Sequence, residues 1–79
     1  MTQKELKTEA LRKLIGKIVL CSDNFERLVL EVDEEHVVYA LEISNGTWMR
    51  LSPTHRAYIA RDLIEGKIVG DANDVKMHA

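Results

Sequence analysis

The sequence predicts a small α+β domain, in which an antiparallel meander of three or four strands is flanked by an N-terminal and a C-terminal helix. Apolar residues recur at helical spacing near the start of the chain and again after residue 52, whereas apolar and polar residues alternate between these segments. The 79 residues are enough for one domain and too few for two. We therefore expect a single domain over residues 1–70 and a flexible tail over residues 71–79.

The first helix is expected to begin at Thr2. Thr2 and Glu5 stand three residues apart, the spacing of a capping box, in which the two side chains satisfy backbone N–H groups at the helix start. Gly16 is placed to end this helix, because glycine readily adopts the left-handed conformation that follows a helix. The apolar stripe of the helix comprises Leu6, Ala10, Leu11, Leu14 and Ile15.

Three segments in the middle of the chain have the pattern of β-strands. Residues 17–22 are short and β-branched, residues 25–32 alternate, and alternation resumes over residues 36–44 after an acidic turn. If Asp33 and His36 flank that turn, both faces of the hairpin agree in one register. That register places Leu30 opposite Tyr39, Leu28 opposite Leu41, and Arg27 opposite Glu42.

Turn and cap signals define the second half of the chain. Asn45-Gly46 is a strong signal for a two-residue hairpin turn, and it leads into a short strand over residues 47–51. Ser52 then caps a second helix with Pro53 at its first position, where a missing N–H costs nothing. Gly66 ends this helix, and residues 67–69 form a short last strand.

The second face of the predicted sheet is too apolar to be left to water. One face carries Val37, Tyr39, Leu41 and Ile43, and the opposite face of a solvated antiparallel sheet should be polar. Instead, the predicted register gives it Val29, Val38, Ala40, Met49 and Leu51. Either helices cover both faces, or this face contacts a second copy of the chain or a partner protein.

Charge is unevenly distributed along the chain. The net charge is −2, but residues 23–42 carry seven acidic side chains and one basic side chain. The hairpin formed by Asp33, Glu34 and Glu35 is therefore a candidate surface for a basic partner protein. Trp48, beside a tight turn, is a further candidate anchor for a partner, since tryptophan is enriched among interface hot spots.

No residue pattern in the sequence is typical of a catalytic centre. The four glycines are scattered at element ends, and the three histidines have no metal-ligand spacing among themselves. Cys21 is the only cysteine, and it is better explained as a small apolar residue of a strand than as a nucleophile. We therefore expect no enzymatic activity, no cofactor and no metal.

Nucleic-acid binding through the basic residues of the two helices is the alternative hypothesis. Basic and aromatic side chains follow one another near the second helix, which is typical of such surfaces. Asp62 and Glu65 interrupt that surface, and the overall charge is negative. The residues that would make the contacts are Arg50, His55, Arg56, Tyr58 and Arg61.

The favoured hypothesis is a small, non-catalytic binding protein of accessory, adaptor or inhibitor type. It would act through contacts with a partner protein or as a homodimer. A cytoplasmic location is expected, because the chain has no apolar run of about 20 residues, no signal-peptide pattern and a single thiol.

Overall fold

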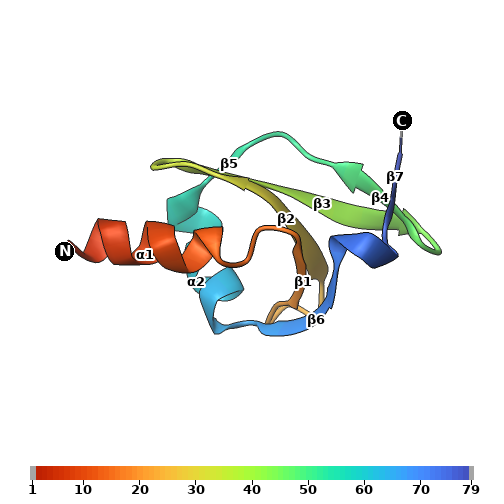
Figure 1. The fold of residues 1–79 in the computed structure, drawn as a ribbon, viewed down its shortest axis with the longest axis horizontal. Helices are drawn as coiled ribbons and strands as arrows, with labels where there is room; N and C mark the ends of the chain where they lie inside the picture. Colours follow the sequence, from red (N-terminus) through yellow and green to blue (C-terminus); the bar gives the residue numbers. More distant parts are fainter. Residues whose placement is uncertain (1, 79) are drawn as a thin grey trace.

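The computed structural model describes residues 2–78, and it confirms the predicted α+β class (Figure 1). The first helix is followed by a mostly antiparallel meander, a second helix and a C-terminal pair of strands. In chain order the elements are α1 (Gln3–Arg12), β1 (Lys17–Leu20), β2 (Glu26–Val32), β3 (His36–Ser44), β4 (Thr47–Arg50), β5 (Thr54–His55), α2 (Arg56–Glu65), β6 (Lys67–Asp71), the 3₁₀ helix η1 (Ala72–Asp74) and β7 (Lys76–Met77).

A single curled sheet forms the body of the protein. Its strand order is β6-β1-β2-β3-β4-β7, and β5 adds a short pairing to β3. All pairs are antiparallel except β4 with β7. The two helices pack against each other and against β2 and β3, so they cover one end of one sheet face (Figure 1).

The start of α1 is as the sequence predicts. Thr2 Oγ1 accepts a hydrogen bond from the Glu5 N–H at 3.1 Å and donates one to the Glu5 carboxylate. The predicted apolar stripe is only partly buried, because Leu11 is fully covered whereas Leu6 and Ile15 remain about half exposed. Thr8 is buried instead, and its hydroxyl donates to the Lys4 carbonyl. The covered face of α1 is therefore partly polar.

The predicted start of α2 at Ser52 and Pro53 is wrong. Thr54 and His55 are extended and pair with the beginning of β3, so the helix begins only at Arg56. The helix cap is His55, whose Nδ1 accepts from the Ala57 N–H at 3.1 Å. Pairing with β3 thus prevails over the local signal of a serine followed by proline.

Gly66 ends α2, as predicted. A side chain at this position would collide with the Val19 side chain and the Leu20 carbonyl. The chain then enters β6, which contains the short last strand expected at residues 67–69.

A bulge at Leu30 changes the register of the first hairpin. Near the turn, Val32 pairs with Val37 as the predicted register requires. Beyond the bulge, Val29 pairs with Tyr39, and Leu28 moves to the other face. The predicted pairings of Leu30 with Tyr39, Leu28 with Leu41 and Arg27 with Glu42 are therefore wrong. An extra residue on one strand exchanges the faces of every residue that follows it.

A second irregularity, at Ile43, does the same to the next hairpin. Ser44 pairs with Thr47 at the predicted turn, but Trp48 then pairs with Glu42, and Met49 pairs with Leu41. The second-face positions expected for Val29, Met49 and Leu51 are consequently wrong, and all three lie on the face with the helices.

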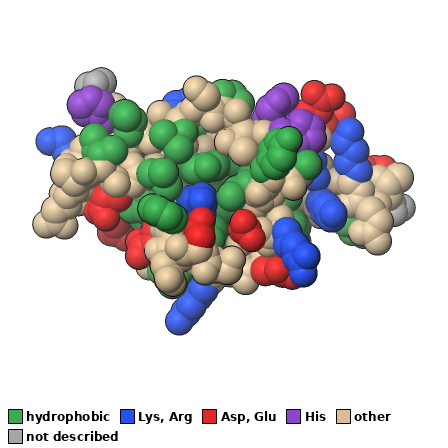
Figure 2. All heavy atoms as spheres, turned by 180° about the vertical axis from the view of Figure 1, so that it is seen from behind, with side chains coloured by type: hydrophobic (Ala, Val, Ile, Leu, Met, Phe, Trp, Pro, Cys, Tyr) green, Lys and Arg blue, Asp and Glu red, His purple; other side chains and the backbone are tan. Residues whose placement is uncertain are grey.

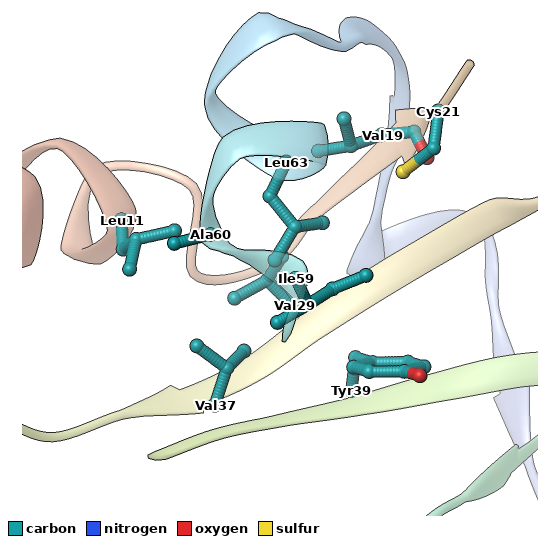
Figure 3. Close-up of a cluster of buried hydrophobic side chains, with 9 residues drawn as sticks. All are labelled: Leu11, Val19, Cys21, Val29, Val37, Tyr39, Ile59, Ala60 and Leu63. Carbon is teal, nitrogen blue, oxygen red and sulfur yellow. The ribbon is translucent and has the colours of Figure 1, made fainter. Parts of the chain in front are cut away.

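The two sheet faces carry separate apolar cores. The main core lies between the sheet and the helices, where Val37 and Tyr39 point from β3 toward α2 (Figure 3). It comprises Leu11, Val19, Cys21, Val29, Val37, Tyr39, Ile59, Ala60 and Leu63. The smaller core on the second face comprises Ile18, Leu28, Ala40 and Trp48, with Leu30 and Val75 packed against it. The prediction that the second face carries many apolar residues is confirmed, although the residues on that face are not all the ones predicted.

The C-terminal segment covers the second face from within the chain. Residues 71–78, where we expected a tail, form the end of β6, η1 and β7 and run from one sheet edge to the other (Figure 1). Hydrogen bonds hold the segment at both edges: the Ala72 N–H donates to the Gly16 carbonyl at 2.7 Å, and the His78 N–H donates to the Trp48 carbonyl at 2.8 Å. Val75 lies between these bonds, against the smaller core.

Arg56 links three elements that are distant in sequence. Its guanidinium donates to the Thr8 hydroxyl, to the Lys4 carbonyl at 3.2 Å, and to the Asp33 and Glu34 carbonyls at 3.4 and 3.2 Å. Only 7% of the residue is exposed. The first residue of α2 thus holds α1 and the turn between β2 and β3 together.

Replacing Arg56 should strongly destabilise the protein. Arg56→Leu leaves the acceptors on α1 and the turn without a donor, so we expect the free energy of unfolding to fall by about 2–4 kcal/mol. Arg56→Lys should retain part of this energy, because one ammonium cannot replace the whole set of bonds. Urea unfolding followed by circular dichroism measures both. Arg61→Gln, at an exposed position of the same helix, is the control and should change stability by less than about 0.5 kcal/mol.

The cap of α2 gives a second stability prediction. His55→Ala should cost about 1 kcal/mol, because the Ala57 N–H loses its acceptor, and His55→Asn should restore most of this loss. Urea unfolding of the three proteins at neutral pH is the measurement. Equal stabilities of the alanine and asparagine variants would contradict the capping role.

Candidate functional site

The helices leave part of the main-core face uncovered. Leu51 lies beside Tyr39, and beyond this pair the apolar side chains of Phe25, Leu41 and Met49 continue the face toward the far end of the strands. Phe25 is 57% exposed and Met49 is 38% exposed, whereas Leu41 and Leu51 are half-buried. Leu41 pairs with Met49 and shares a shallow pocket of about 250 Å³ with Phe25. We call these four residues the open patch. Hydrophobic side chains gather across this side of the molecule in Figure 2.

Arg27 adjoins the open patch and is held rigidly. Its Nη1 and Nη2 donate to the two carboxylate oxygens of Asp23 at 3.1 and 2.9 Å. The guanidinium carbon lies 5.8 Å from the centre of the Phe25 ring and 5.3 Å from that of Tyr39, within range of cation–π attraction. Only 11% of the Arg27 side chain is exposed. The arginine thus connects the open patch to the main core.

The electrostatics of this pair favour both charged forms. The Arg27 guanidinium, helped by the Phe25 N–H, holds the pKa of the Asp23 carboxyl below its usual value. The same hydrogen bonds raise the pKa of Arg27. Arg27 Nε is buried and has no hydrogen-bond partner among residues 2–78, so burying this side chain has an uncompensated cost.

Charged residues lie at the edge of the open patch. Glu26 and Glu42 line the pocket that Phe25 and Leu41 form. Glu42 pairs with Trp48, and Glu26 lies two residues before Leu28, so both glutamate side chains project from the second face. The charges on the face of the patch itself are those of the Asp23–Arg27 ion pair, which balance each other.

The predicted acidic hairpin lies at the opposite end of the same strands. Asp33 Oδ1 accepts from the Glu35 and His36 N–H groups at 2.7 and 2.6 Å, and these bonds lower the pKa of the Asp33 carboxyl. The Glu35 carbonyl accepts from the Arg56 N–H, so the turn is docked on α2. Asp33 follows Phe25 by eight residues of extended chain, which is about 26 Å. The acidic hairpin and the open patch are thus separate surfaces.

The apolar residues predicted to bind a partner have unequal accessibility. Val29 is completely buried in the main core, and Val38 and Trp48 are only 6% and 4% exposed. Met49 is the member of this predicted set that reaches the surface, on the face with the helices. The sequence analysis placed Leu51 with Met49 on the second face, and it did not single out Phe25, Arg27 or Leu41 as contact residues. The two bulges bring Leu41 onto the same face as Met49.

The predicted nucleic-acid-binding residues are only partly brought together. His55, Tyr58 and Arg61 are exposed near the start of α2, where the rings of His55 and Tyr58 lie 6.3 Å apart. Arg56 is buried beneath them. Arg50 pairs with Ala40 of the second face and forms an ion pair with Glu31, so it does not join this group.

Cys21 lies in the main core rather than in a cleft. Its thiol is 3% exposed, and burial, partly offset by Arg27, raises its pKa above the usual value. A thiol with a raised pKa stays protonated at neutral pH and is a weak nucleophile. Among residues 2–78, no three His, Cys, Asp or Glu side chains are placed to hold a metal ion.

Acid should weaken the contribution of the Asp23–Arg27 pair to the free energy of unfolding. A carboxyl with a lowered folded-state pKa stabilises the protein above its unfolded pKa of about 3.9, and this stabilisation is lost as pH falls through the lowered value. We therefore expect Asp23→Asn to be less stable than the parent protein at pH 7 and pH 5, with the difference narrowing below about pH 4. Urea unfolding at pH 7, 5 and 3 measures this. A difference that stays constant down to pH 3 would exclude the charged pairing as its cause.

Neither α1 nor α2 has the length and the apolar character needed to traverse a lipid bilayer. Comparison with known proteins adds no relative: no protein-family model, no curated protein and no solved structure matches this chain.

Proposed function

We propose that this protein is a non-catalytic binding module, and that its open patch contacts a partner protein whose matching surface is apolar. The exposure of Phe25 and Met49 beside half-buried Leu41 and Leu51 carries this proposal. An apolar surface of this kind on a small domain is typical of an interaction site, because burying it gives favourable free energy.

The composition of the surface supports a protein partner. Phenylalanine, methionine and arginine are enriched in the centres of protein interfaces. Arg27 is already fixed by Asp23 and by the rings of Phe25 and Tyr39, so little side-chain freedom remains to be lost on binding. A preorganised arginine beside exposed apolar groups is a favourable arrangement for a hot spot.

We propose a different protein as the partner of the open patch. In a two-fold symmetric dimer the same patch would occur on both subunits, so self-association is the competing outcome. The experiments below distinguish the two.

The two surfaces first suggested by the sequence are weaker candidates. The second face is covered by Val75 and the segment around it, which leaves less apolar area for a dimer. Glu34 and Glu35 are exposed, but their backbone is held by Arg56, and they lie far from the open patch. The buried free thiol of Cys21 suits a reducing compartment, so we place this binding in the cytoplasm.

Photo-crosslinking followed by a measured affinity tests the proposal. A photoreactive amino acid at position 25 should crosslink a distinct protein in the native host, whereas the same group at position 68 on β6 should not. The identified protein, once purified, should bind the chain directly. Met49→Glu should then raise the Kd at least about tenfold, since it places a charge in the apolar contact. The matched control Ile68→Glu should leave the Kd nearly unchanged, because Ile68 is 53% exposed on the edge strand β6, and three strands separate β6 from the β4 strand of Met49.

Two outcomes would overturn the proposal. Equal effects of Met49→Glu and Ile68→Glu, with both proteins folded by circular dichroism, would show that the open patch is not the contact. A dimer in analytical ultracentrifugation that Met49→Glu dissociates would assign the patch to self-association.

A further inference from the structure

A second surface, distinct from the open patch, lies where the beginnings of α1 and α2 meet. A groove of about 340 Å³ runs between the two helices, and four basic side chains line it: Lys4, Lys7, Arg56 and Arg61. Glu34 is the single carboxylate among the lining residues. In a protein of net charge −2, this is a local concentration of positive charge.

Helix geometry brings these side chains together. Lys4 and Lys7 are three residues apart on α1 and therefore lie on the same face of that helix. Ala57, Ala60 and Arg61 line the groove from α2. The two alanines are small, so space remains between the helices where larger side chains would fill it.

Acidic side chains offset part of the positive charge of the groove: Glu34 lies at its wall, and the rest of the acidic hairpin adjoins Arg56. Among residues 2–78, neither Lys4 nor Lys7 takes part in an ion pair. Arg61 pairs with Glu65 at 3.3 Å, but its side chain is 86% exposed. An ion pair at such an exposed position has a small interaction free energy.

Arg56 provides an independent observation. Only 7% of its surface is exposed, yet all of its side-chain hydrogen bonds go to one hydroxyl and to backbone carbonyls. No carboxylate among residues 2–78 forms an ion pair with it. Neutral oxygens satisfy its donors without cancelling its charge, so Arg56 adds positive potential beside the groove, although the Asp33 carboxyl, whose pKa Arg56 helps to lower, lies within its field. The positive end of the α2 dipole, at His55 and Arg56, acts in the same direction.

From this arrangement we propose that the groove between α1 and α2 binds the phosphate group of a small ligand. A phosphate carries more than one negative charge and several acceptor oxygens, which suits two lysines and an arginine on opposite walls. The groove has the size of a small-molecule site. A long polyanion is disfavoured, because Glu34 lies at the wall and residues 23–42 carry seven acidic side chains.

Titration with pyrophosphate, followed by amide NMR shifts at low salt, tests this site. We expect saturable shifts centred on Lys7, Ala57 and Arg61. The double variant Lys7→Glu/Arg61→Glu should weaken binding at least about tenfold, through loss of two attractive charges and gain of two repulsive ones. Lys67→Glu/Lys76→Glu changes the net charge equally at exposed positions outside the groove, and it should weaken binding much less.

Three results would overturn the proposal. The first is shifts that never saturate, and the second is an equal loss of binding in the two double variants. The third is that a twelve-nucleotide single strand binds more tightly than pyrophosphate and that affinity rises further with longer strands, which would indicate a polymer site. Met49→Glu should bind pyrophosphate as the parent protein does, so failure of the open-patch proposal would leave this result unaffected.

Discussion

The arrangement of the helices depends on one buried guanidinium. Arg56 begins α2, and its donors reach the backbone of α1 and of the turn between β2 and β3, so three segments are fixed by one side chain. A cation is an expensive group to bury, and here neutral oxygens rather than a carboxylate compensate it. Because the bond partners are backbone carbonyls, their positions are set by α1 and by the hairpin themselves. The angle between the helices, and thus the end of the sheet they cover, follows from this contact.

Local chemistry made the order of elements predictable, and non-local pairing limited what else could be predicted. The Thr2 cap, the Asn45-Gly46 turn and the Gly66 helix end all rest on residues within a few positions of one another, and the structure contains each of them. The bulges at Leu30 and Ile43 have no such local signal, yet each moves the following residues to the other face. The position of Leu41 beside Met49 in the open patch was therefore not predicted. The start of α2 was misplaced for the same reason, since the pairing of Thr54 and His55 with β3 overrides the local cap.

The candidate surfaces occupy opposite ends of the two long strands. At one end, β2 and β3 extend past the helices, where Phe25 is exposed and Leu41 is half-buried; at the other, the turn between them is docked against α2 beside the basic groove. The two surfaces also differ in chemistry, since one is apolar and the other is polar and positive. A rigid sheet joins them, so a protein bound at one end and a small anion bound at the other would not compete for space.

The C-terminal segment has a consequence for the order of folding. β7 pairs with β4, and Val75 packs on a core built from residues 18–48, so the smaller core closes only when residues 71–78 dock on the sheet. Before they dock, Trp48 and Leu28 lack this cover. A form in which this segment is detached from the sheet exposes the second face to chaperones or to neighbouring chains.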